Sequence, residues 1–106
     1  MINARENLLN TTNKLLAAGL NHGASGNCSC RDGGGFLITP TGIDSSKLTT
    51  DMMVRMNLSD DLPQPESKYQ PSSEWQFHQA ILEKYPEINA VVHTHSVFAS
   101  TLSVLG

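Results

Sequence analysis

Apolar residues near the start of the chain recur at helical spacing. Four leucines lie among good helix formers between residues 3 and 18, and Gly19 follows them directly. Residues three and four apart share one face of a helix, and a glycine after the last apolar position is a common helix stop. The pattern therefore predicts an amphipathic helix over residues 3–18, whose leucines are Leu8, Leu9, Leu15 and Leu16.

The pattern then changes to short apolar runs divided by glycine and proline. NCSCR at 27–31 and GFLITP at 35–40 predict two strands of a hairpin, with its turn in RDGGG. MMVRMNL at 52–58 predicts a further strand after a polar connection, and the proline-rich, polar segment 59–71 predicts a loop.

Helical spacing returns in PSSEWQFHQAILEKYP at 71–86. A serine at 72 or 73 can cap this helix, Ser73 with Gln76 fits a capping box, and Pro86 ends the pattern. We expect three residues at helical spacing to face the core: Phe77, Ile81 and Tyr85.

The last apolar segments predict a strand over residues 89–95 and a helix over 96–105. Alternating helices and strands indicate an α/β layered domain, which we take to be one domain over residues 1–106. The chain stops at Gly106 directly after the apolar segment, so we expect the sequence to be cut from a larger fold.

The composition narrows the class of protein. Of 106 residues, 39% are hydrophobic and 16% charged, with a net charge of −3, which is the profile of a globular protein. Lysines and arginines are scattered singly, so no nucleic-acid partner is expected. The sequence has no apolar run long enough to cross a membrane and no N-terminal pattern typical of a leader, so the expected location is the cytoplasm.

Two cysteines, Cys28 and Cys30, stand two residues apart in NCSC. A disulfide between such neighbours is sterically awkward. We interpret them as small apolar side chains on one face of a strand. A metal role stays open, but it lacks a second cysteine pair.

The motif VVHTHS places His93 and His95 on one face of the predicted strand, with Cα atoms about 6.5 Å apart. Zinc binds imidazole nitrogen, and a strand could hold both ligands toward one ion. Spacing alone leaves two hypotheses open: a metal site, or two buried histidines that hydrogen-bond within the core.

The predicted helix that begins near Ser72 offers further ligands. Glu74 would stand in its first turn and His78 four residues on, on the same face. Together with the two strand histidines they could complete a four-ligand set. Helical periodicity alone favours the alternative that Glu74 is a charge at the helix start and His78 an interface residue.

Turns near these residues are suited to an anion. GASGN at 23–27 combines two glycines with the Ser25 hydroxyl and the Asn27 amide, and paired serines open the helix. TPTG at 39–42 adds a third turn. Each turn also fits an ordinary loop, but together they suggest a phosphate site beside a metal site.

Four motifs in order now carry a resemblance: GASGNCSCR, LITPTGI, PSSEWQFH and AVVHTHS. The chain resembles the class II aldolase and adducin family, most closely its fuculose-1-phosphate aldolase type, over the N-terminal half of such a protein. The resemblance implies a three-layer α/β/α fold with a mainly antiparallel central sheet, truncated here.

The resemblance also implies a zinc site. It assigns Glu74, His93 and His95 as the zinc ligands, with a third histidine beyond Gly106, and gives His78 a structural role. Glu74 is in addition the implied catalytic acid/base, and zinc would act as a Lewis acid on the oxygens of a sugar phosphate. The implied phosphate-binding residues are Gly26, Asn27, Thr41, Gly42, Ser72 and Ser73.

The implied activity is cleavage of a sugar phosphate such as L-fuculose 1-phosphate to dihydroxyacetone phosphate and an aldehyde, by a cytoplasmic homotetramer. Ala24 departs from the family, which commonly has threonine there, and the two cysteines stand where aliphatic residues are frequent. Alternatives within the family are a ribulose-5-phosphate 4-epimerase, a decarboxylase or a dehydratase. Glu74 disfavours the epimerase, whereas HTHS favours it. A non-catalytic, adducin-like interaction domain is a further alternative.

Overall fold

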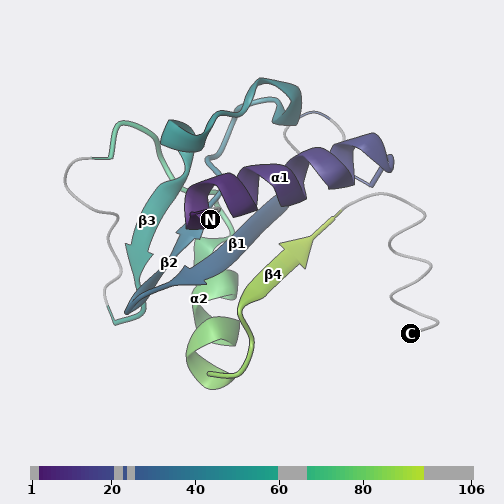
Figure 1. Ribbon diagram of the computed structural model, residues 1–106. Helices are drawn as coiled ribbons and strands as arrows, with labels where there is room; N and C mark the ends of the chain where they lie inside the picture. Colours follow the sequence, from purple (N-terminus) through teal and green to yellow (C-terminus); the bar gives the residue numbers. More distant parts are fainter. Residues whose placement is uncertain (1–2, 21–22, 24–25, 60–66, 95–106) are drawn as a thin grey trace.

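A computed structural model describes residues 3–20, 23, 26–59 and 67–94 of the chain. Figure 1 shows how its helices and strands are arranged. In chain order the elements are α1 (Ala4–Ala17), β1 (Asn27–Asp32), β2 (Gly35–Ile38), the 3-10 turns η1 (Ser45–Lys47) and η2 (Thr50–Met52), β3 (Val54–Asn57), α2 (Trp75–Lys84) and β4 (Ala90–His93).

The strands form an antiparallel sheet in the order β3-β2-β1-β4 among the described residues. The predicted hairpin is confirmed: Cys30 pairs with Leu37, and the turn is made by Gly33 and Gly34. On its other side β1 pairs with β4, where Cys28 lies opposite Val92. Both β1 and β2 therefore have a paired strand on each side.

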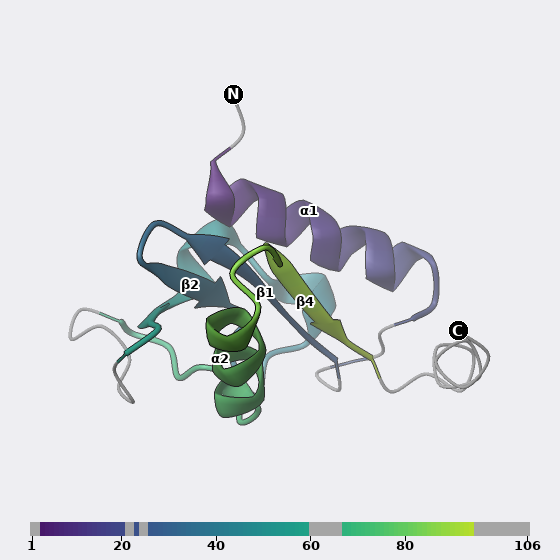
Figure 2. The same ribbon diagram turned by 90° about the horizontal axis from the view of Figure 1, so that it is seen from below.

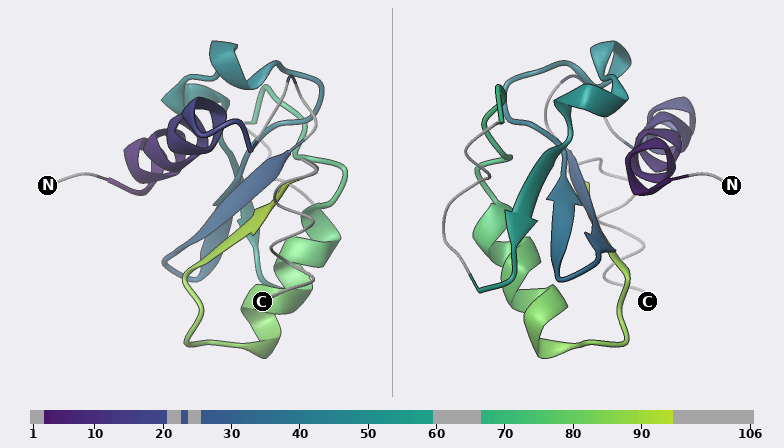
Figure 3. Two further views of the ribbon diagram at one scale, coloured as in Figure 1. Left: turned by 90° about the vertical axis from the view of Figure 1, so that its right-hand side faces the viewer. Right: turned by 60° about the vertical axis from the view of Figure 1, so that its left-hand side comes forward.

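The two helices cover opposite faces of the sheet. The views in Figures 2 and 3 place α1 on one side and α2 on the other. This arrangement confirms the expected three-layer α/β/α fold with an antiparallel sheet. Within the described part of the chain, none of the helices has the length and apolar character needed to cross a membrane.

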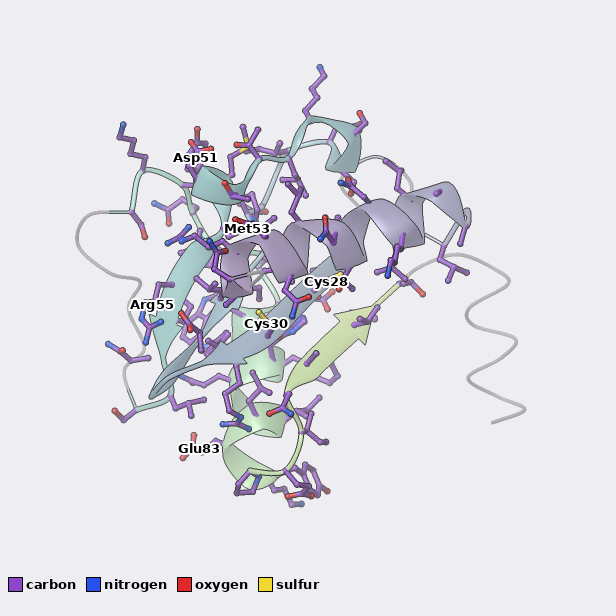
Figure 4. All side chains as sticks on the ribbon, viewed as in Figure 1. Cys28, Cys30, Asp51, Met53, Arg55 and Glu83 are labelled. Carbon is purple, nitrogen blue, oxygen red and sulfur yellow. The ribbon has the colours of Figure 1, made fainter. Side chains whose placement is uncertain are left out.

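Alternation along the strands divides the core into two clusters. Between α1 and the sheet, Leu8 packs with Cys28, Leu37 and Met53, and Cys30 joins them at the edge. Figure 4 shows the two cysteines on β1 beside α1, so the interpretation of NCSC as a core strand is confirmed. The cluster on the α2 side consists of Phe36, Ile38, Val54, Met56, Leu82 and Val91.

Glycines fix the predicted end of α1 and the start of β2. The N–H of Gly19 (φ 74°) donates to Leu16 and that of Leu20 to Leu15, which is the hydrogen-bond pattern of a glycine-terminated helix. At Gly35, a Cβ atom would lie 2.2 Å from the carbonyl oxygen of Met56. Any other residue would therefore push β2 away from β3.

The start of α2 differs from the sequence prediction. Its first helical residue is Trp75, and Glu74 holds the preceding N-cap position, so Glu74 is not within the first turn. The N-cap position belongs to Glu74, not Ser73, so the capping box predicted for Ser73 and Gln76 is wrong.

The core-facing side of α2 also differs. Phe77 is 52% and Tyr85 42% exposed, so the prediction that both face the core is wrong, whereas Ile81 packs against the α2-side cluster. The buried positions of α2 are His78 and Leu82, also four residues apart. Because His78 is polar, apolar spacing alone does not predict that it occupies a core position.

Arg31 of β1 closes the C-terminal end of α2. Its guanidinium donates to the carbonyl oxygens of Leu82, Tyr85 and Ile88 at 2.7 to 3.2 Å. The last carbonyls of a helix lack partners within the helix, and a cation there also interacts favourably with the helix dipole. Arg31 therefore joins the sheet to α2 at the end opposite Glu74.

We predict that Arg31→Ala lowers the free energy of unfolding by about 2 to 3 kcal/mol, because several carbonyls lose a charged donor at once. Denaturant unfolding measures this loss. Arg55→Ala is the matched control: its ion pair with Asp32 is partly exposed, so we expect a cost below about 1 kcal/mol. Equal costs for the two variants would refute the capping role.

Candidate functional site

The described residues that were predicted to carry the chemistry gather at one end of the strands, which we call the sheet edge. Because β1 runs antiparallel to β2 and β4, its first residue lies beside the ends of both neighbours. Asn27 accordingly pairs with His93. The segment that leads into α2 joins the same edge, since the N–H of Ser72 donates to Thr39 at 2.9 Å.

Two of the predicted metal ligands meet at this edge. The Nδ1 atom of His93 lies in direct hydrogen-bond contact with Oε2 of Glu74. Their side chains are 36% and 33% exposed, respectively, so a ligand could reach both. An imidazole nitrogen and a carboxylate oxygen are donor types that zinc takes, and the pair therefore fits part of a zinc site.

The third predicted ligand, His95, lies outside the described residues, as does the helix predicted over 96–105. Within the described ranges, the structure brings together no group of three or more potential metal ligands. What the structure adds to the prediction is therefore the contact of Glu74 with His93.

The turn before α2 holds Glu74 in position. The Oγ atom of Ser72 accepts from the N–H of Glu74 at 3.3 Å, and the Ser72 carbonyl accepts from Trp75 at 3.0 Å. Ser72 is itself buried and paired with the residue that follows β2. The backbone of Glu74 is thus tied to the sheet edge through Ser72.

The predicted phosphate residues occupy three neighbouring segments. Gly26 and Asn27 open β1, Thr41 and Gly42 follow β2, and Ser72 and Ser73 precede α2. Besides the bond from Ser72 to Thr39, further contacts link these segments: the Thr39 Oγ1 atom accepts from the Cys28 N–H at 3.2 Å, and the Thr41 N–H donates to the Gln70 carbonyl at 3.0 Å. Asn27 and Ser72 are buried, whereas Thr41, Gly42 and Ser73 are exposed.

His78 forms contacts that apolar and polar spacing in the sequence did not predict. Its ring is fully buried, with Nδ1 2.6 Å from Oγ of Ser29 and Nε2 in hydrogen-bond contact with Oδ1 of Asn27. In NCSC the polar residues alternate with the cysteines, and that alternation places Asn27 and Ser29 together on the α2 face. This alternation is the feature of the sequence from which a polar partner for His78 could have been predicted.

Burial has a clear effect on the charge of His78. It lowers the pKa of His78 to about 4, which the nearby charge of Glu74 partly opposes and His93 slightly reinforces. The ring is therefore neutral at physiological pH. A neutral ring has one nitrogen that donates and one that accepts, as two different partners require.

The cysteine thiols are not part of the site at the sheet edge. Burial raises the pKa of the Cys28 thiol to about 11, with a smaller opposing effect from its hydrogen bond to Thr12. Burial likewise raises the pKa of Cys30. Thiols that stay protonated are poor nucleophiles and poor metal ligands, which agrees with their place in the core.

The three-layer fold and the carboxylate–imidazole pair at its edge agree with the resemblance in the sequence. The Class II Aldolase and Adducin N-terminal domain matches residues 6–106 of the chain. The chain therefore belongs to the class II aldolase and adducin family.

Similar proteins are aldolases that act on sugar phosphates. The chain is 46% identical over 103 residues to a 5-methylthioribulose-1-phosphate/5-deoxyribulose-1-phosphate aldolase of Escherichia coli O45:K1, covering 97% of this chain and 47% of the relative. It is 42% identical over 98 residues to the L-fuculose phosphate aldolase of Escherichia coli K12, covering 92% and 44% of the two chains.

A solved structure of an L-fuculose 1-phosphate aldolase superimposes with a TM-score of 0.83 at 30% sequence identity, covering 96% of this chain and 48% of that one. The chain thus spans about half the length of the relatives that it matches.

The lowered pKa of His78 predicts a pH dependence of stability. Between pH 6.5 and about 4 the unfolded chain takes up a proton that the folded chain excludes, so the free energy of unfolding falls as the pH falls, by up to about 3 kcal/mol. Denaturant unfolding at a series of pH values measures this slope. His78→Gln has no titrating ring and should flatten it, and an unchanged slope would contradict the assignment.

Proposed function

We propose that this chain forms the N-terminal part of a class II aldolase that cleaves a sugar 1-phosphate to dihydroxyacetone phosphate and an aldehyde. The observation that carries the proposal is the contact of Glu74 with His93 beside Asn27, in a chain of this family. Relatives named as aldolases of 5-methylthioribulose 1-phosphate and L-fuculose phosphate support it.

The proposed cofactor is zinc, held by Glu74, His93 and His95. The first two donors are in contact, and the third stands two residues beyond His93 in the sequence. Bound there, zinc would supply Lewis-acid stabilisation of negative charge that develops on the substrate oxygens.

The proposed acid/base is Glu74. Its side chain is two-thirds buried, and its backbone is held at the sheet edge by the Ser72 turn. When substrate separates it from His93, a lone pair becomes available to take a proton from the carbon beside the substrate carbonyl in synthesis, and to return it in cleavage.

Six residues would bind the phosphate without a positive side chain. The Asn27 amide, the hydroxyl groups of Thr41, Ser72 and Ser73, and the backbone of Gly26 and Gly42 offer uncharged hydrogen-bond donors, and backbone and hydroxyl donors of this kind commonly bind phosphate. This set recognises the phosphate group and leaves the rest of the sugar unspecified. We further propose a cytoplasmic homotetramer for the full-length protein.

Zinc content tests the cofactor. We expect a full-length protein that carries this chain to retain about one zinc per subunit through metal-free buffer, measured by mass spectrometry. His93→Ala should weaken zinc affinity by more than about tenfold, because a ligand is lost. Glu83→Gln removes a carboxylate of α2 that Figure 4 shows away from the sheet edge, and should keep the metal. A metal-free wild type would favour the non-catalytic, adducin-like alternative.

Glu74→Gln tests the acid/base. We expect turnover of L-fuculose 1-phosphate and 5-methylthioribulose 1-phosphate, whichever the wild type cleaves, to fall by about 10²- to 10⁴-fold, because an amide cannot accept the proton. The measurement is the release of dihydroxyacetone phosphate, and Glu83→Gln is the control with unchanged turnover. Turnover of Glu74→Gln at the wild-type rate would exclude this role.

A further inference from the structure

We propose that His78 is a positioning residue that fixes the orientation of the Asn27 side-chain amide, so that its nitrogen and not its oxygen is offered to the substrate phosphate. The inference rests on the proposed function, because it assumes that Asn27 binds phosphate. It adds a residue that no part of the proposed mechanism uses.

The contacts of the His78 ring carry the argument. The ring lies against β1 and reaches both Asn27 and Ser29, one with each nitrogen. The three side chains are almost completely buried, with residue exposures of 0% for His78, 6% for Asn27 and 1% for Ser29. Water is therefore excluded from the contacts of the ring, and Asn27 and Ser29 must satisfy its two nitrogens.

The roles of the two ring nitrogens follow from the chemistry of the partners. The Oδ1 atom of Asn27 can only accept, so Nε2 of His78 must carry the proton and donate it. Nδ1 is then an acceptor, and the Ser29 hydroxyl donates to it. Ser29 can serve either tautomer, whereas Asn27 in this orientation can serve only one.

The hydrogen bond to His78 also determines where the Nδ2 group of the Asn27 amide points. With Oδ1 bound to His78, the two N–H groups of Nδ2 are left for another acceptor, and none of the described residues accepts from them. A buried donor without an acceptor is unfavourable by about 1 to 3 kcal/mol. A phosphate oxygen would supply the acceptor. If the amide were flipped, its own oxygen would face the phosphate, and two acceptors cannot form a hydrogen bond.

The same helix connects this contact with the proposed base. The N–H of His78 donates to the carbonyl of Glu74 at 3.3 Å, one helical turn away. Helix α2 thus presents the carboxylate at its start and the imidazole one turn later. Both reach the sheet edge at the pair formed by Asn27 and His93. A single rigid element therefore sets the spacing between the metal and phosphate groups.

Nitrogen-15 NMR of ¹⁵N-histidine-labelled protein without ligand tests the tautomer directly. We expect His78 to be neutral with its proton on Nε2. A proton on Nδ1 would overturn the inference, because Nε2 would then be an acceptor and Asn27 would have to turn its NH₂ group toward the ring. This result does not depend on whether the protein binds phosphate.

Two amide variants of His78 test the effect on binding. A glutamine amide reaches the position of ring Nε2 and keeps a donor for Asn27, whereas an asparagine amide reaches only the position of Nδ1. We expect His78→Asn to weaken the affinity for inorganic phosphate about tenfold, because this is the effect of losing about one hydrogen bond. His78→Gln should weaken the affinity by less than about threefold. Phosphorus-31 NMR titration measures both. Equal losses in the two variants would overturn the inference.

A double-mutant cycle separates positioning from a general structural role. In an Asn27→Ala background, His78→Asn should leave phosphate affinity unchanged, because no amide remains to be oriented, although stability would still fall. If His78→Asn weakened phosphate affinity in the Asn27→Ala background as much as in the wild type, His78 would have a structural role alone. Absence of phosphate binding by the unmodified protein would overturn the proposed phosphate site together with this inference, whereas additive losses would overturn the inference alone.

Discussion

The pairing of β1 with a neighbour on each side is the constraint on which the rest of the molecule depends. Because both neighbours run antiparallel to it, the start of β1 meets the end of β4 and the chain that leaves β2. Asn27 thereby comes to lie opposite His93, although the two residues are 66 positions apart in the sequence. A slip of one residue would turn Asn27 toward α1 and exchange it with Cys28. The register is therefore set by the same alternation that builds the core and the site.

That alternation explains how a polar cluster can be buried within a small domain. On one face of β1, Cys28 and Cys30 pack against α1 as apolar groups. On the other face, Asn27 and Ser29 find their partners on a single ring, that of His78. Each polar atom in these contacts has a hydrogen-bond partner, so burial of the cluster is tolerated. The cluster also specifies the position of α2 along the sheet more narrowly than apolar packing would.

The layered fold, the helix over 3–18 and the hairpin could be predicted, because each depends on local spacing and on glycine positions. The face of α2 could not be predicted from apolar periodicity. Phe77 and Tyr85 have the right spacing but lie at the surface, since the helix is rotated so that His78 meets Asn27. Glu74 and His93 could be proposed as ligands from the motifs, but their contact depends on strand register, which no local pattern contains.

The start of α2 has a physical reason that bears on its chemistry. Glu74 occupies the N-cap position, where a short polar side chain would bond to the helix and stabilise it by about 1 kcal/mol. Within the described structure the Glu74 side chain makes no such bond and contacts His93. The helix thus lacks a side-chain cap at this residue, and Ser72 instead supports the backbone just before it. A capping carboxylate would be held by backbone N–H groups, so the absence of this bond leaves the Glu74 side chain available to exchange partners and protons.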